Sequence, residues 1–421
     1  FKYVYFVTFL RLDNWFWNGY VYNAYSLSFC IFNHYLFYLQ SLSYFQKMKI
    51  LHIVSSLESS QGGPPNVVYS LAEEQKKLGH KVRIAGFANE SLNKKKNFRV
   101  IKGNFIISRF YVPDLNFIIK IYNSIKYSDI VHLHGVWNGV ISISALLCRF
   151  HKKKVILTAH GSLDKFNIKN KAIFKKIYFN LIEKFNLSYI HGYHFLTLNE
   201  YKNSTWFKSI KNKNILVQSN SINLDKINKI QFKNRILKIK NIKTITYLGR
   251  LNKIKNINLQ IDLINNLIKR KIFFKLNIIG PDNGMLQILK KKVFKLNLEK
   301  YVTFKKPIYG KEKYYWLKKS DIIILTSFYE CNSVTAIETM AVGGVLLATR
   351  NCNLQEAAVA GAVKISNYSI SDLIKSVNFL SIKKNSDMIR KNALCYSREN
   401  LNINNSVMKI LDFYKLINNK V

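Results

Sequence analysis

Short apolar runs alternate with longer segments of helical period along most of the chain. Such runs, bounded by turn residues, indicate buried strands of a parallel sheet. In the first half, the predicted strands are residues 49–54, 81–88, 129–133, 154–158, 194–198 and 214–217. Residues 65–78 have the apolar spacing of an amphipathic helix that ends before Gly79. Strands and helices in this order predict a doubly wound α/β half.

The same alternation starts again after a Lys- and Asn-rich stretch. The predicted strands of this second half are residues 244–248, 274–279, 301–304, 321–326 and 345–348. Two similar halves predict two Rossmann-like domains that face each other across a cleft. The expected parts are an N-terminal extension (1–47), a first domain (48–222), a linker (223–243), a second domain (244–390) and a C-terminal helix that packs back toward the first domain (391–421).

The first 47 residues have a different pattern. No charged side chain occurs between Asp13 and Lys47, but polar residues interrupt every apolar run before it reaches the length of a membrane span. The order of segments that a signal peptide requires is also missing. Because Met48 opens the first clear strand, we interpret residues 1–47 as upstream translation or a dispensable extension, with a membrane-associating aromatic segment as the alternative.

Two carboxylates follow the strand predicted at 321–326. Glu330 and Glu338 flank the start of a predicted helix, in a chain with only 23 acidic residues. A strand-to-helix loop at the carboxyl end of a parallel sheet is where such folds bind ligands. The helix start offers N–H groups to a phosphate, and carboxylates accept hydrogen bonds from sugar hydroxyls. This favours a sugar-nucleotide site; the alternative is that Glu330 only interacts with the helix dipole and Glu338 lies on a solvated face.

Two loops of the first half also fall at carboxyl ends of strands. Gly62 and Gly63 follow the first strand, and glycines there let the backbone approach a phosphate or an acceptor, although a simple turn is an equal explanation. His160 follows the strand at 154–158, where it could donate to a sugar oxygen or serve the structure alone.

A third loop carries cations. Arg250 ends the first strand of the second half, and Lys255 lies five positions on. A guanidinium fork and an ammonium point charge at this place would stabilise a departing diphosphate. The alternative is that these two cations have no function, because lysine is common throughout this chain.

Charge and composition restrict the partners. The chain has 66 Lys and Arg against 23 Asp and Glu, a net charge of +43. The lysines are spread over nearly the whole chain and no recognition motif accompanies them, so we expect no nucleic-acid partner. Contact with an anionic membrane surface remains open. Five scattered cysteines indicate neither a disulfide framework nor a zinc site, which fits a reducing cytoplasm.

Metal ligands are also few. His132 and His134 lie on one side of a predicted strand, but no third ligand is evident. Neither an Asp-x-Asp motif nor a P-loop occurs. We therefore expect no metal and no resident cofactor.

In their order and spacing, these motifs resemble glycosyltransferase family 4, the group 1 transferases, whose fold is GT-B. The matching segments lie between Met48 and about Ile365. The resemblance implies a retaining hexosyltransferase that moves a sugar from a nucleoside diphosphate donor to a glycan or lipid-linked acceptor, without an essential metal. Expected settings are surface polysaccharide biosynthesis and the cytoplasm, with peripheral contact at the inner face of the membrane.

The resemblance also assigns residue roles. Arg250 and Lys255 would hold the donor diphosphate, Glu330 would contact the transferred sugar, and Glu338 the ribose hydroxyls. His160 would line the sugar pocket. Gly62 and Gly63 would lie on the acceptor side of the phosphate. The other backbone contacts with the donor would come from Gly249, Ser333, Val334 and Thr335.

Some positions depart from the family. Ser333 stands where members commonly carry Gly, and Val345 where they carry Pro. Ser333 could narrow the room for a diphosphate. Two alternatives therefore stay open: a sugar-nucleotide epimerase of GT-B fold, and a catalytically decayed relative that binds a partner or a membrane.

Overall fold

The computed structural model describes residues 47–58, 63–88, 99–107, 110–169, 172–204, 213–230 and 242–419. The interpretation of the N-terminal extension therefore lies outside the described residues, apart from Lys47, and so does Gly62. Residues 48–421 form one compact unit, which the following paragraphs describe by itself.

The first half is built on a seven-stranded parallel sheet, with the order β3-β2-β1-β6-β7-β8-β9. Its strand order reverses between β1 and β6, which is the point where open sheets place their ligands. The strands are β1 (Lys49–Ser56), β2 (Lys81–Phe87), β3 (Arg99–Gly103), β6 (Ile130–His134), β7 (Lys154–Thr158), β8 (Gly192–Phe195) and β9 (Asn214–Val217).

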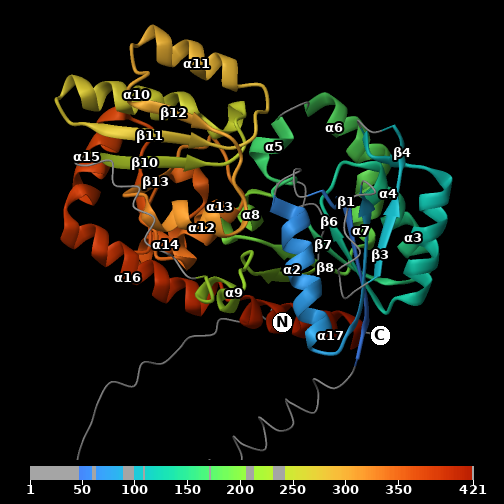
Figure 1. The fold of residues 1–421 in the computed structure, drawn as a ribbon. Coiled ribbons are helices and arrows are strands. Elements are labelled where there is room, and N and C mark those ends of the chain that lie inside the picture. Colours follow the sequence, from blue (N-terminus) through green and yellow to red (C-terminus); the bar gives the residue numbers. More distant parts are fainter. Residues whose placement is uncertain are drawn as a thin grey trace, which may run out of the picture. The chain divides into compact units, whose positions relative to one another are not determined.

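Helices cover both faces of this sheet (Figure 1). They are α2 (Gly63–Lys77), α3 (Leu115–Tyr127), α4 (Gly139–Phe150), α5 (Lys165–Lys169), α6 (Ala172–Tyr178), the π-helix η3 (Phe179–Glu183), α7 (Lys184–Tyr189) and α8 (Leu198–Asn203), with a small hairpin of β4 (Phe105–Ile107) and β5 (Val112–Pro113). Asp114 and Asn138 begin α3 and α4 as side-chain N-caps. Thr197 caps α8 in the same way, and for this reason β8 ends at Phe195 and does not extend to residue 198 as predicted.

The second half has a six-stranded parallel sheet with the order β12-β11-β10-β13-β14-β15. Its strands are β10 (Lys243–Leu248), β11 (Phe274–Ile279), β12 (Val302–Lys305), β13 (Ile322–Leu325), β14 (Leu346–Thr349) and β15 (Lys364–Ser366). Its helices are η5 (Lys253–Lys255), α10 (Ile257–Lys269), α11 (Leu286–Lys295), α12 (Gly310–Lys319), α13 (Val334–Ala341), η6 (Arg350–Cys352), α14 (Gln355–Val359), α15 (Ile370–Ser381) and α16 (Lys383–Asn400). The predicted fold class, two Rossmann-like α/β domains, is confirmed.

The chain passes between the halves twice, and both passages lie together. On the first passage, α9 (Leu224–Asn228) buries Leu224 and Ile227 in the core of the second half, although the sequence placed this segment in a linker. On the second passage, Ile403 donates a backbone hydrogen bond to Ile222. The last helix, α17 (Ile403–Asn419), then packs beside α2 into a core of the first half (Figure 1).

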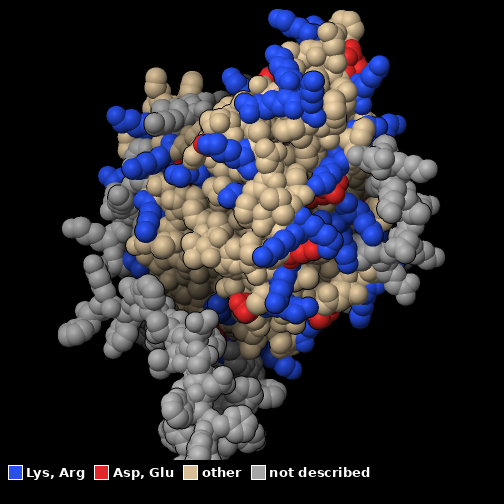
Figure 2. Space-filling model, turned by 90° about the vertical axis from the view of Figure 1, so that its left-hand side faces the viewer, with Lys and Arg blue, Asp and Glu red and all other residues tan. Residues whose placement is uncertain are grey.

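The basic side chains are scattered over the surface. Figure 2 shows Lys and Arg distributed across one face of the molecule, with few Asp or Glu among them. On this face the excess charge does not outline a single stripe, as a nucleic-acid groove would require.

Candidate functional site

Two loops of the second half meet at the carboxyl ends of β10 and β13. Lys255, at the end of η5, forms an ion pair with Glu330, which follows β13. The Ser327 hydroxyl donates a hydrogen bond of 2.8 Å to the same carboxylate oxygen, Oε1. The Lys255 side chain is 20% exposed and the Glu330 side chain 12%. The structure thus brings together two residues that the sequence assigns to one site, and both side chains are largely sheltered from water.

Hydrogen bonds to the main chain hold the Glu330 loop against its neighbours. The Phe328 N–H donates to the Ile254 carbonyl at 2.8 Å. The Asn353 side-chain amide donates to the Glu330 carbonyl at 2.6 Å. Because the backbone is held on both sides of the ion pair, the Glu330 carboxylate has a defined place next to Lys255.

Arg250 follows β10 and is held through its main chain. The Tyr247 hydroxyl donates a hydrogen bond of 2.8 Å to the Arg250 carbonyl. A Cβ added to Gly280 would lie 1.9 Å from the Gly249 carbonyl oxygen. The loop after β11 therefore needs a glycine at position 280 to pack against the loop after β10. No ion pair among the described residues involves the Arg250 guanidinium. Its charge is therefore not neutralised by a neighbouring carboxylate of the described chain.

The helix α13 begins directly after the Glu330 loop, and Ser333 is its N-cap. Ser333 has a φ of −73° and its hydroxyl accepts a hydrogen bond of 3.4 Å from the Ala336 N–H. The backbone at this position does not require glycine, and serine is among the favoured N-cap residues. As first-turn residues, Val334 and Thr335 have N–H groups without a partner inside the helix, the arrangement that binds phosphate.

Glu338 lies within α13 and is buried, with 6% of its surface exposed. Its carboxylate forms an ion pair with Lys313 of α12 and accepts a long hydrogen bond of 3.5 Å from the Tyr314 hydroxyl. Burial raises the pKa of Glu338, and the Lys313 charge acts in the opposite direction. The solvated helix face considered from the sequence is therefore wrong for Glu338. Lys313 was missed, because nothing in a lysine-rich helix distinguishes it from its neighbours.

His160 lies in a turn after β7, with a left-handed φ of 50°, and Gly161 follows with a φ of 80°. The buried carboxylate of Glu200 accepts a hydrogen bond from the Gly161 N–H, and its second oxygen accepts one of 2.7 Å from the Leu196 N–H. Burial raises the pKa of Glu200 while these N–H groups act to lower it. Glu200, which sequence reasoning missed, thus holds the turn that carries His160.

Loops of the first half lie against the Glu330 loop and α13. A Cβ added to Gly161 would lie 2.8 Å from the Cβ of Cys331, and one added to Gly63 would lie 3.1 Å from Cγ2 of Val334. The His160 turn and the start of α2 therefore border the same region as Glu330 and the N-terminus of α13. Of the residues assigned from sequence, only Gly62 lies outside the described part of the chain.

Three buried histidines lie beside this region on neighbouring strands. The partner that the sequence did not reveal for His132 and His134 is His52 of β1, which pairs in register with His132. One ring nitrogen from each lies within 4.8 Å of those of the other two, as in a metal site. All six ring nitrogens, however, have hydrogen-bonding partners within the protein. A metal ion would have to break this network.

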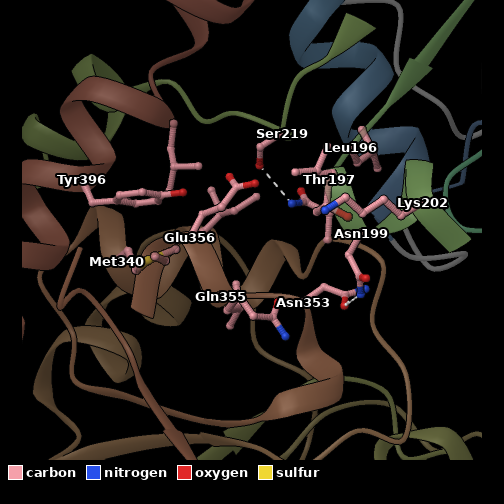
Figure 3. Close-up of a pocket in the computed structure, with 16 residues that line it drawn as sticks. Leu196, Thr197, Asn199, Lys202, Ser219, Met340, Asn353, Gln355, Glu356 and Tyr396 are labelled. Atoms are coloured by element: carbon pink, nitrogen blue, oxygen red, sulfur yellow. Dashed lines mark hydrogen bonds between the residues drawn. The ribbon is translucent and has the colours of Figure 1, made fainter. Parts of the chain in front are cut away.

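A separate cavity of about 310 Å³ lies where the two halves meet (Figure 3). Ile337 and Met340 of α13 line it, together with Asn199 and Lys202 of α8 and Tyr396 of α16. At its edge, the Asn199 side chain donates a hydrogen bond of 2.6 Å to Asn353. Among the residues assigned to the site from the sequence, none lines this cavity.

Two parallel α/β sheets, with cations, carboxylates and a helix N-terminus gathered at their carboxyl ends, define a two-domain GT-B protein. The family model for "Glycosyl transferases group 1" matches residues 228–394, and that for "Glycosyltransferase Family 4" matches residues 61–226. The chain belongs to the group 1/family 4 glycosyltransferases, which are transferases of class EC 2.4. None of the curated proteins is similar enough to count as a match.

Solved structures support the fold. A glycosyltransferase from Rickettsia africae is 18% identical with a TM-score of 0.69, covering 90% of this chain and 100% of its own. Anabaena HepE, solved with UDP and glucose, is 14% identical with a TM-score of 0.69 and coverages of 87% and 99%. WaaG, a glycosyltransferase involved in lipopolysaccharide biosynthesis, is 14% identical with a TM-score of 0.64 and coverages of 86% and 99%. In the described part of the chain, no helix has the length and apolar character needed to cross a membrane.

Proposed function

We propose that this protein transfers a sugar from a nucleoside diphosphate donor to a glycan or lipid-linked acceptor, with retention at the anomeric carbon. The observation that carries the proposal is that the Lys255–Glu330 pair, the first-turn amides of α13 and the His160 turn lie at one place. HepE, solved with UDP and glucose, lends support to a uridine diphosphate sugar as donor.

In this proposal the cations and the helix start bind the diphosphate. Arg250 offers a planar fork, Lys255 a point charge, and Val334 and Thr335 offer N–H groups at the positive end of the helix dipole. Negative charge grows on the diphosphate as its bond to the sugar breaks, so these groups bind the transition state more tightly than the bound donor. Leaving-group stabilisation is then the main catalytic contribution.

The two glutamates orient the donor. Lys255 and Ser327 occupy Oε1 of Glu330, and no described residue donates to its Oε2, which would accept a hydrogen bond from a sugar hydroxyl. Lys313 and Tyr314 likewise occupy Oε1 of Glu338, and its Oε2 would accept from the ribose hydroxyls. Each carboxylate thus has one oxygen fixed by the protein and one for the donor.

The proposed reaction needs no metal and no protein nucleophile. The acceptor hydroxyl attacks on the face from which the diphosphate departs, and the protein acts by positioning and by electrostatics. Neither departure from the family argues for a decayed enzyme, since Ser333 caps α13 and Val345 is fully buried directly before β14.

Screening nucleoside diphosphate sugars tests this function. A donor should raise the thermal unfolding temperature, and the freed nucleotide should appear when donor and acceptor are combined, with chelator present or absent. NMR of the product should show the anomeric configuration of the donor. Inversion, or a strict metal requirement, would contradict the mechanism; an epimerised donor without transfer would identify the epimerase instead.

We propose that the first half, which would bind the acceptor, also contacts an anionic membrane. Such a contact fits a lipid-linked acceptor and a cytoplasmic location. A role in surface polysaccharide synthesis, as for WaaG in lipopolysaccharide biosynthesis, also fits it. Large apolar side chains along α6, η3 and α7 are exposed, among them Phe174 at 75% and Leu181 at 75%. The remaining exposed apolar members are Ile173, Ile177, Ile182 and Phe185. Lys176 and Lys184 lie between them in the sequence. Apolar groups with interspersed cations are typical of segments that lie on anionic lipid.

Vesicle sedimentation tests the membrane contact. Binding to anionic vesicles should exceed binding to neutral ones, and Phe174→Ser with Leu181→Ser should weaken it several-fold. Val359→Ser is the matched control, because Val359 is 91% exposed on the second half. Equal loss of binding in the control, or binding unchanged by the double substitution, would contradict this face as the contact.

A further inference from the structure

Nine hydrogen-bonding groups in and behind the His160 turn form two neighbouring rows. In one row, His160 Nε2 lies 3.2 Å from His134 Nδ1, and His134 Nε2 lies 3.0 Å from His52 Nδ1. His52 Nε2 lies 2.8 Å from Oε1 of Gln75, a residue of α2. The row therefore runs from the turn at the site to a buried residue in the last turn of α2.

The second row starts at a backbone carbonyl. His194 Nε2 lies 2.8 Å from the Gln218 carbonyl, and His194 Nδ1 lies 2.9 Å from the Thr158 hydroxyl. That hydroxyl lies 2.7 Å from His132 Nε2, and His132 Nδ1 lies 2.6 Å from the Tyr414 hydroxyl. This row ends on α17.

These histidines are neutral, which limits each ring to one proton. Burial lowers the pKa of His52 and His194 to about 4 and that of His160 to about 3. It lowers the pKa of His132 and His134 well below the ordinary value, and neighbouring histidines add to the shift. A neutral imidazole donates from one nitrogen and accepts at the other, so each link determines the next.

The backbone carbonyl gives the second row its direction. A carbonyl only accepts, so His194 donates from Nε2 and accepts at Nδ1 from the Thr158 hydroxyl. The Thr158 oxygen therefore accepts from His132 Nε2, and His132 Nδ1 accepts from the Tyr414 hydroxyl. The single proton of Tyr414 is used in this step.

The Gln75 amide oxygen gives the first row its direction. Gln75 Oε1 lies 2.8 Å from His52 Nε2. An amide oxygen only accepts, so His52 donates to it from Nε2.

From Gln75 the direction carries through to the site. His52 accepts at Nδ1 from His134 Nε2, and His134 accepts at Nδ1 from His160 Nε2. We propose that this ordered chain fixes one tautomer of His160, with the proton on Nε2 and the lone pair on Nδ1, and that Gln75, His52 and His134 are positioning residues. His160 then accepts a hydrogen bond from a sugar hydroxyl at Nδ1 and does not donate one. Only this last consequence rests on the proposed function.

The tautomer is measured directly on the full chain labelled with 15N-histidine. Long-range 1H–15N correlation spectra near pH 7.5 distinguish the two ring nitrogens, and the signals lost in His160→Asn assign His160. The chain predicts one tautomer, with the proton on Nε2. A proton on Nδ1, or a mixture of both tautomers, would overturn the proposal. Because no donor or turnover is needed, a protein without transferase activity still tests it.

A remote substitution tests the role of the chain. Gln75→Met removes the oxygen that sets the direction, so the His160 signals should change to a mixture of tautomers. Leu71→Met is the control, because Leu71 lies one turn earlier on the same buried face of α2 without entering the chain. A His160 tautomer that is unchanged in Gln75→Met contradicts the proposal. If Gln75→Met does not fold, the measurement on the unsubstituted protein decides.

Discussion

The two glutamates and Lys255 each have a partner that the linear sequence does not show. Lys255 and Glu330 are 75 positions apart, yet their charges meet in one ion pair. The partners of Glu338 and of the His160 turn, Lys313 and Glu200, are 25 and 39 positions away. Motif order predicted that Lys255 and Glu330 belong to one site, and the ion pair joins them. It could not predict these partners, because a lysine or a buried glutamate carries no local pattern that marks its contact.

The cations offer the first residue-scale prediction. Arg250→Ala or Lys255→Ala should lower kcat/KM by about 100- to 1,000-fold, since each removes a charge from the developing leaving group. Lys253→Ala is the control, because Lys253 is exposed on the same 3₁₀-helix. Steady-state kinetics with a thermal unfolding scan check the result. If both purified variants react at nearly the rate of the unsubstituted protein, Arg250 and Lys255 do not form the donor site.

A second prediction concerns pH and the buried histidines. The folded-state pKa of His52 is about 4, below the ordinary 6.5, so the unfolded chain binds more protons between these values. The free energy of unfolding therefore keeps its full value, as far as His52 is concerned, above about pH 6.5 and falls as the pH drops toward 4. The loss due to His52 is about 2 kcal/mol at pH 5.

Urea unfolding at pH 7 and pH 5 measures this effect. The free energy of unfolding should fall less between the two pH values in His52→Gln than in the unsubstituted protein, because glutamine does not titrate. Buried Glu183 and Glu200 have raised pKa values and oppose the histidines in both proteins, so the difference between proteins isolates His52. An equal fall in both would show that His52 is not held neutral.

At the scale of elements, the sequence predicted the buried strands that are rich in apolar residues. β6, β7, β11 and β13 lie close to their predicted bounds because parallel strands covered on both faces are mostly apolar. β3 was missed, since this edge strand carries Arg99 and Lys102 and shows no such pattern. β15 is only three residues long, too short for a pattern.

The helix α13 supplies a prediction at this scale. Ser333→Ala should cost about 1 kcal/mol of stability, because the Ala336 N–H loses its cap, whereas Ser333→Gly should cost a few tenths. If the hydroxyl serves only as a cap, Ser333→Gly should keep the donor KM within about threefold. Chemical denaturation and donor titration check the two effects. A large gain in activity in Ser333→Gly would mean instead that the serine obstructs the diphosphate.

At the scale of the molecule, the C-terminal helix ties the end of the chain to the first half. Ile403, Val407, Ile410 and Leu411 of α17 join the core that contains the start of β1 and the buried face of α2. The hydroxyl of Tyr414 reaches His132 on β6, 282 positions earlier. The sequence predicted that a helix within 391–421 would pack back. It could not place the boundary, since α16 continues the second half to Asn400 and only α17 returns.

Tyr414→Phe tests how firmly this return is held. The substitution keeps the ring but leaves buried His132 Nδ1 without its donor, so the free energy of unfolding should fall by about 1 to 3 kcal/mol. Tyr315→Phe is the matched control, since the buried Tyr315 hydroxyl has no hydrogen-bonding partner among the described residues and its loss should cost little. Urea unfolding of both variants beside the unsubstituted protein measures the difference. Similar stabilities for the two variants would show that the hydroxyl contact does not help to hold α17 against the first half.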